Sequence, residues 1–246
     1  MFDGITINKY PNCGFGNKIL YYFNLRQLSY KNNLPFSSAI FDGLELFEGN
    51  MTGNLNIKNP LNLNFCLGEL FFETELSTRD VFKIKKEYLL DNINQEKKRC
   101  AIHFRGTDFF TWNKDSILDS EYYIKSIKEI IEDFNKVEFL LFTDDKNLSS
   151  YKDVIKYLSQ INFNYHFGEN TPNRTKFQND FINMSFCDYI ISSPSTFCIT
   201  AGFIGKNKKI IHSKNWLKNR SNKKDKFWEI LFTQGGNLNY NLWKAI

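Results

Sequence analysis

The chain has 246 residues, 42% of them hydrophobic, so it is long enough to build one large core or two small ones without a disulfide or a metal to hold it. Its formal charge of +5 suits a phosphorylated ligand, or a weak association with an anionic membrane surface, and argues against a nucleic-acid-binding domain. The sequence has no apolar run of transmembrane length, no signal peptide and no CxxC pair among its five cysteines, so we expect a cytoplasmic protein with reduced thiols.

The first residues predict a strand, a glycine-containing loop and a helix. The strand covers residues 5–10 (ITINKY) and the loop covers residues 11–17 (PNCGFGN). Apolar residues at helical spacing follow, and Asn32, Asn33 and Pro35 are expected to end the helix. This order is the start of a βα unit.

The next segments are more broken. Residues 36–80 contain short apolar pieces between Asn and Gly, which predict short strands and loops. The charged segment 78–98 is compatible with a helix that bridges two domains.

From residue 99 on, predicted strands and helices alternate. We expect strands at residues 99–104, 137–143, 161–167, 187–193 and 208–213. We expect helices at residues 120–134 (capped by Asp119 or Ser120), 147–160, 179–186 and 195–205, and a helix or turn in the last thirty residues. This alternation predicts βαβ crossovers, a parallel sheet and an α/β fold.

Polar residues follow three of these strands at the point where each strand ends. They are residues 103–108 (HFRGTD), 143–145 (TDD) and 192–196 (SSPST). In an open parallel sheet, ligands bind at the carboxyl ends of the strands, near the point where the strand order reverses. The three segments therefore predict one polar rim.

The segment 192–196 predicts an anion-binding site. The strand stops at Ser193 and Pro194 and a helix starts at Ser195, which leaves backbone N–H groups and the positive end of the helix dipole beside the hydroxyls of Ser195 and Thr196. The simpler interpretation is that Ser195 or Thr196 caps the helix, and both interpretations can hold at once.

The charged residues of the other two strand ends each have alternatives. Arg105 offers planar donors that match phosphate oxygens, so a diphosphate fits, or it pairs with Asp108 as a structural partner. Asp144 and Asp145 are suited to hold a divalent metal, to accept the N–H groups of a nucleobase such as guanine, or to cap the next helix. The residues alone do not choose among these.

In order and spacing, four segments resemble the fucosyltransferase superfamily, which includes the bacterial α-1,2-, the α-1,6- and the protein O-fucosyltransferases. The segments are CGFGNKILYYFNLRQLSYKNN, AIHFRGTD, LLFTDD and NDFINMSFCDYIISSPSTFCITAGFIG. They are similar to the G-x-G-N-(Q/K) loop and helix, the H-x-R-R-x-D motif, the strand that ends in Ser/Thr-Asp-Asp, and the D-x-x-x-M-S-x-C block that continues into I-x-(S/N)-S-(S/T)-F.

The resemblance implies a GT-B fold, in which two Rossmann-like domains face each other across a cleft. The small acceptor-side domain would cover residues 1–95 and the nucleotide-sugar-binding domain residues 96–246. The implied activity is an inverting transfer of L-fucose from GDP-fucose to a hydroxyl of a glycan acceptor, with no metal and no other cofactor. The sequence does not indicate the linkage, the acceptor or the oligomeric state.

The resemblance also implies roles for individual residues. Arg105 would be catalytic, contacting the β-phosphate and the charge that develops on the leaving GDP. The other implied donor-binding residues are His103 at the nucleotide, Asp108 as the last acid of its motif, Asp144 or Asp145 at the guanine, and Ser193, Ser195 and Thr196 at the diphosphate. Gly14, Gly16 and Asn17 would form a cleft loop close to the sugar and the acceptor.

The sequence departs from the family pattern at several points. Gly106 stands where the motif has its second arginine, the last helix lacks the Trp-Trp-Gly seen in many α-1,2 enzymes, and the chain is shorter than typical members. The general base is unassigned among Asp3, Asp42, Glu69 and Glu73.

Three other hypotheses remain open. The protein is a GT-B transferase that uses another nucleotide sugar, a metal-dependent GT-A transferase in which residues 143–145 bind the metal, or, because of Gly106, a sugar-nucleotide-binding protein without turnover. A dinucleotide-dependent oxidoreductase is not indicated, since CGFGNK lacks the third glycine of GxGxxG.

Overall fold

The computed structural model describes residues 1–64, 76–88, 98–112, 114–134, 136–168, 174–205, 209–213 and 243–245. These residues form two compact units, one made of the described residues up to Tyr88 and the other of those from Lys98 on. Each unit has its own parallel sheet.

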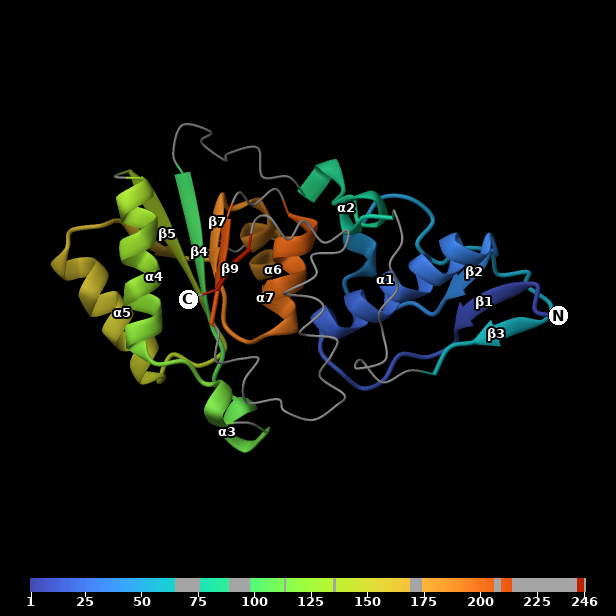
Figure 1. Cartoon of the computed structure of the whole chain (residues 1–246), viewed down its shortest axis with the longest axis horizontal. Coiled ribbons are helices and arrows are strands. Elements are labelled where there is room, and N and C mark those ends of the chain that lie inside the picture. Colours follow the sequence, from blue (N-terminus) through green and yellow to red (C-terminus); the bar gives the residue numbers. More distant parts are fainter. Residues whose placement is uncertain are drawn as a thin grey trace. The chain divides into compact units, whose positions relative to one another are not determined.

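The first unit is built on a three-stranded sheet in the order β2-β1-β3, with α1 along one of its faces (Figure 1). Its strands and helices are β1 (Gly4–Ile7), α1 (Phe15–Asn32), β2 (Phe36–Ser38), β3 (Pro60–Asn62) and α2 (Thr78–Val81). The central strand β1 pairs in parallel with both neighbours. The predicted end of α1 is confirmed, because Asn33 adopts the left-handed conformation at φ 51° and ψ 43°.

The helix expected over residues 78–98 is present in its described part only as two short pieces, α2 and a 3-10 helix at Lys86–Tyr88. After the single turn of α2, Phe82 leaves the helical region with φ −115° and ψ 79° and is only 1% exposed. Its ring packs against the rings of Tyr22 and Phe47, at centroid distances of 5.4 and 5.0 Å. Burial of this ring outweighs the helical propensity of the charged residues around it. Residues 89–97 lie outside the described residues.

The second unit contains a six-stranded parallel sheet in the order β6-β5-β4-β7-β8-β9. Its strands are β4 (Lys98–Phe104), β5 (Val137–Thr143), β6 (Tyr165–Phe167), β7 (Tyr189–Ile191), β8 (Lys209–His212) and β9 (Trp243–Ala245). The chain builds outward from β4 to β6 and then crosses back to β7 on the other side of β4. This is the strand order of a Rossmann-like sheet, and it reverses between β4 and β7.

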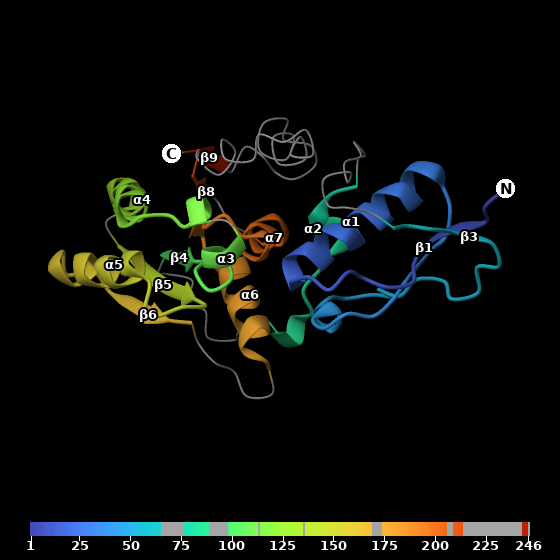
Figure 2. The ribbon, with the colours of Figure 1, turned by 90° about the horizontal axis from the view of Figure 1, so that it is seen from below.

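Helices cover both faces of this sheet (Figures 1 and 2). One face carries α4 (Ser120–Asp133) and α5 (Ser149–Gln160), and the other carries α6 (Lys176–Phe186) and α7 (Thr196–Ile204). A short helix, α3 (Phe109–Trp112), follows β4. The α/β class and the predicted alternation are therefore confirmed.

Local signals explain where the helices begin and what they bury. Asp119 caps α4, as predicted, by accepting a hydrogen bond from the backbone N–H of Tyr122 at 3.0 Å. The apolar sides of α4 and α5 pack on β4 and β5. The core between them contains fully or nearly fully buried side chains, including Ile102, Phe104, Ile127, Phe139, Leu141 and Val154.

The described end of the chain differs from its prediction. Residues Trp243–Ala245 form a strand, not a helix or turn, and pair in parallel with β8. A three-residue strand is too short to show a period in the sequence, so only its pairing with β8 reveals it. Residues 214–242 lie outside the described residues. In the described part of the chain, no helix combines the length and apolarity needed to cross a membrane.

Candidate functional site

The predicted site residues of the second unit gather at the carboxyl edge of its sheet, where the strand order reverses between β4 and β7. In sheets of this kind the crevice at the reversal is the usual ligand site. His103 lies near the end of β4, Asp144 and Asp145 directly follow β5, and Ser193 follows β7. The predicted rim is thus formed by adjacent strand ends.

A side-chain contact joins β4 to the segment after β7, at the point where the strand order of the sheet reverses. Nδ1 of His103 lies 2.6 Å from Oγ of Ser193, although the two residues are 90 positions apart. Both side chains are buried. Burial, followed by the nearby charge of Arg105, lowers the pKa of the His103 imidazole to about 3, so this ring is neutral at physiological pH.

Arg105 stands just past the end of β4 between two carboxylates. Its Nη1 lies 2.9 Å from Oδ2 of Asp144, and its Nη2 lies 2.9 Å from the carboxylate oxygens of Asp108. The Arg105 side chain is 30% exposed, and the Asp108 side chain is 57% exposed. The structural pairing of Arg105 with Asp108 is therefore present, and the guanidinium is partly exposed on that side.

Asp144 holds the loop that carries Arg105. Besides the ion pair, its carboxylate accepts hydrogen bonds from the backbone N–H of Gly106 and from the hydroxyl of Thr107, each at 2.8 Å. The side chain is only 23% exposed. With its two oxygens engaged by these donors, Asp144 is poorly placed to bind a metal ion or a guanine base and well placed to orient Arg105.

Asp145 faces a different set of groups. Its Oδ1 accepts a hydrogen bond from the backbone N–H of Asn147 at 2.8 Å, and the hydroxyl of Thr143 bonds the Asp145 backbone. The helix-cap alternative for these aspartates is wrong, because the N-cap of α5 is Leu148 and no side chain caps it. In the hydrogen bonds and ion pairs described here, the loop that follows β4 contacts Asp144 and not Asp145.

The start of α7 has the geometry of an anion-binding site. Ser195 occupies the N-cap, as predicted, with φ −125° and ψ 128°, but its side chain forms no capping hydrogen bond. The first turn of the nine-residue helix begins with Thr196, and its N–H groups have no carbonyl partner within the helix. Ser193 and Ser195 are both buried beside this turn. Hydroxyl and N–H donors thus converge next to His103.

The packing around Gly106 explains the missing second arginine. Gly106 is buried, and a Cβ added to it would lie 2.8 Å from Cδ2 and 2.9 Å from Cγ of Leu148, a buried side chain. A side chain at position 106 would therefore run into the core below the loop. Glycine at position 106 therefore fits the packing of Leu148 against the loop.

We expect Gly106→Ala to lower the free energy of unfolding by about 1–3 kcal/mol, because the added methyl overpacks the contact with Leu148. Urea unfolding measures this change. In a Leu148→Ala background the same substitution should cost much less, since the opposing side chain is gone. An equal cost in both backgrounds would show that Leu148 is not the reason for glycine at this position.

The predicted cleft loop and the candidate bases belong to the first unit. Gly14 is the N-cap of α1, Gly16 is buried in its first turn, and Oδ1 of Asn17 is buried without a hydrogen-bond partner. The carboxylate of Asp3 accepts hydrogen bonds from the N–H groups of residues 58 and 59, so it is structural. Asp42 is exposed, and residues 69 and 73 lie outside the described residues.

The sequence reasoning missed three residues around this site. Lys176 on α6 forms an ion pair with Asp180 at 2.7 Å, and its charge helps to lower the pKa of His103. Burial raises the pKa of Asp180. The hydroxyl of Tyr122 donates to the carbonyls of Ser192 and Ile211 and ties the ends of β7 and β8 together. The Lys176–Asp180 spacing of four residues on a helix was a usable signal, whereas Tyr122 had none.

Comparison with known proteins matches residues 69–231 to the model of glycosyl transferase family 11. The match covers about two thirds of the chain and includes all of the site residues described in the second unit. A search of curated proteins found no match.

Proposed function

The chain belongs to glycosyl transferase family 11 and is therefore a glycosyltransferase, and we propose that it transfers L-fucose from GDP-fucose to a hydroxyl of a glycan acceptor. The transfer inverts the anomeric carbon and needs no metal or other cofactor. Residues 1–95 form the acceptor-side domain and residues 96–246 the donor domain of a GT-B enzyme. We propose the cytoplasm as its compartment, since the described cysteines are free thiols.

The observation that carries this proposal is the set of donors at the reversal of the sheet. The guanidinium of Arg105, the neutral imidazole of His103 and the start of α7 lie at adjacent strand ends. Planar N–H donors and the N-terminus of a helix are the groups that bind a diphosphate in proteins. Ser193, Ser195 and Thr196 add hydroxyls to the same place.

These groups suit the chemistry of the transfer. When the bond from fucose to GDP breaks, the sugar becomes oxocarbenium-like and negative charge grows on the β-phosphate. Donors already fixed in position stabilise this charge more in the transition state than in the ground state. The exposed Asp108 gives way to the phosphate, since surface ion pairs are weak, while the less exposed Asp144 keeps the guanidinium oriented.

In this proposal, Asp145 binds the guanine base of the nucleotide. Asp144 is engaged by Arg105, Gly106 and Thr107, whereas Asp145 contacts only its own turn in the hydrogen bonds described above. A carboxylate accepts the two neighbouring N–H groups of guanine at once, which an adenine or a uracil does not offer. The preference for GDP over other nucleotides follows from this contact.

A thermal-shift panel of GDP, UDP, ADP and CMP, each with and without EDTA, tests the donor and the metal together. GDP at about 100 times its Kd should add about 2.7 kcal/mol to the stability and raise Tm by several degrees, with EDTA making no difference. Stabilisation by UDP and not by GDP would contradict the donor. Loss of the shift on chelation would favour the metal-dependent GT-A alternative instead.

A further inference from the structure

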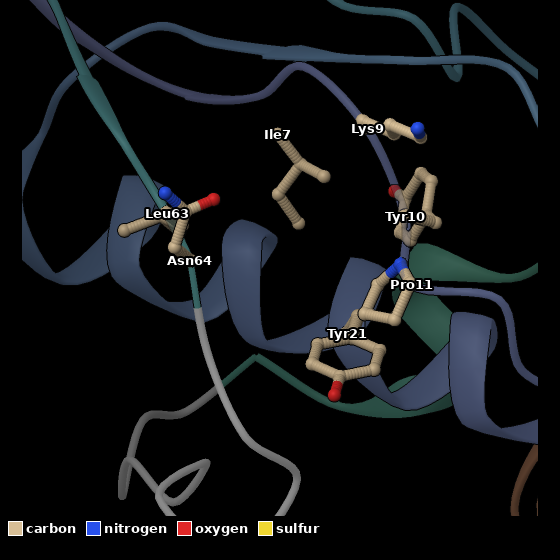
Figure 3. A pocket seen from close by; sticks show the side chains of 7 residues that line it. All are labelled: Ile7, Lys9, Tyr10, Pro11, Tyr21, Leu63 and Asn64. Atoms are coloured by element: carbon tan, nitrogen blue, oxygen red, sulfur yellow. The ribbon is translucent and has the colours of Figure 1, made fainter.

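A pocket of about 220 Å³ lies within the first unit, beside the carboxyl ends of β1 and β3 (Figure 3). Its lining residues are Ile7, Lys9, Tyr10, Pro11, Tyr21, Leu63 and Asn64. All of them except Tyr21, which comes from α1, end or follow one of these two strands. The carboxyl ends of parallel strands are where ligands of α/β units bind.

The pocket has an apolar floor and a polar rim. Ile7, Tyr10, Tyr21 and Leu63 are buried, whereas Lys9 and Asn64 at the rim are exposed. In Figure 3, Tyr10, Pro11 and Tyr21 lie along one side of the pocket and Leu63 and Asn64 along the other. Small-molecule sites combine such a floor with a few polar groups. A pyranose ring fits this pattern, because its C–H face packs on aromatic and aliphatic side chains while its hydroxyls reach the rim.

Two buried amides on α1 lie one turn before and one turn after the pocket-lining Tyr21. Asn24 is 2% exposed, yet both its Oδ1 and its Nδ2 lack a hydrogen-bond partner, and Oδ1 of Asn17 is buried without one. Buried amides normally have partners. At 3.6 residues per turn, Asn17, Tyr21 and Asn24 share one face of the helix, with the pocket-lining tyrosine between the two amides. Neither amide is among the lining residues, so Tyr21 is the residue of this helix face that a ligand in the pocket would contact.

We infer that this pocket binds one pyranose ring of the acceptor glycan, and the inference rests on the proposed function. Tyr21 and Pro11 pack against the apolar face of the ring, and Lys9 and Asn64 bond its hydroxyls. Among the described residues, the lining includes no carboxylate and no histidine. We therefore assign these described residues a role in positioning the acceptor.

The test measures binding of a panel of methyl pyranosides to the whole chain by saturation-transfer NMR. We expect at least one methyl pyranoside to bind, and Asn64→Ala to weaken its binding on the order of tenfold, which corresponds to about 1.4 kcal/mol. Asn64 is exposed, so this variant should fold. Tyr21→Leu should weaken binding further, and Tyr30→Leu, at an exposed position of the same helix, is the matched control that should not.

Asn24→Leu separates a ligand contact from a structural role. The Asn24 amide is buried without a partner and does not line the pocket, so leucine should raise Tm and leave pyranoside binding unchanged. Absence of binding by every pyranoside, or equal binding by wild type and the Asn64 and Tyr21 variants, would overturn the inference. GDP binding, measured on the same samples, reports on the proposed function separately, because a protein that binds GDP and no pyranoside loses only this inference.

Discussion

Replacing Arg105 by alanine should lower kcat by about 10²–10³-fold, because the guanidinium is the group placed to meet the charge on the leaving β-phosphate. The loss should appear more strongly in kcat than in the Kd for GDP, since the contact strengthens in the transition state. Arg105→Lys should recover part of the rate at most, as a lysine cannot reproduce the planar contacts to Asp144 and a phosphate. Steady-state kinetics with GDP-fucose and a glycan acceptor measure these changes.

Lys152→Ala is the matched control for this experiment. Lys152 is an exposed cation on α5 in the same unit, so its removal changes the net charge equally without touching the site. Its kcat should stay within about twofold of wild type, as expected for a surface substitution. Near-normal turnover by Arg105→Ala would contradict the catalytic role of this residue.

Asp144→Asn should reduce turnover on the order of 10²-fold although Asp144 is not proposed to touch the substrate. Its carboxylate holds Arg105, the N–H of Gly106 and the hydroxyl of Thr107, and the neutral amide cannot satisfy all three donors. The loss of charge-assisted bonds should also lower the free energy of unfolding by about 1.5–3 kcal/mol. Kinetics and urea unfolding of the same preparation measure both effects.

Asp145→Asn distinguishes a positioning role from contact with the base. Inosine diphosphate lacks the exocyclic amino group of GDP, so a residue that binds this group sets the preference between the two nucleotides. Asp145→Asn should reduce the preference for GDP, whereas Asp144→Asn should lower kcat and leave the preference unchanged. The reverse pattern would assign the guanine to Asp144. Thr107→Ala removes one exposed hydrogen bond to Asp144. It should lower kcat less than Asp144→Asn does, and it should change the preference for GDP less than Asp145→Asn does.

Local signals were sufficient for most of the second unit. The run VEFLLFT predicts a buried strand, and β5 covers these same residues. Asp119 predicts a helix start through its capping side chain, and α4 begins at Ser120. Prediction failed where packing competed with local preference, as at Phe82, whose ring enters the core of the first unit and ends α2 after one turn. It also failed at β9, whose three residues are strand only through their pairing with β8.

For the candidate site, the sequence predicted the residues better than their partners. It indicated Arg105 and the acidic pair as members of one rim, but it treated Asp144 and Asp145 as equivalent. Only the hydrogen bonds of the two carboxylates separate a residue that orients Arg105 from one that does not. Tyr122 was missed because its importance comes from strand ends that meet only in space, whereas Lys176 had a local signal in its spacing from Asp180.

The sequence by itself determined the α/β class, the order of strands and helices in the second unit and the family motifs, because periodicity, caps and turn residues act over a few neighbouring positions. Tertiary structure alone decided that His103 meets Ser193 across 90 positions and that Leu148 leaves no room for a side chain at Gly106. Both contacts depend on the order in which the strands assemble and on how side chains fill the space between them. Neither the strand order nor the packing leaves a signal in a few neighbouring sequence positions.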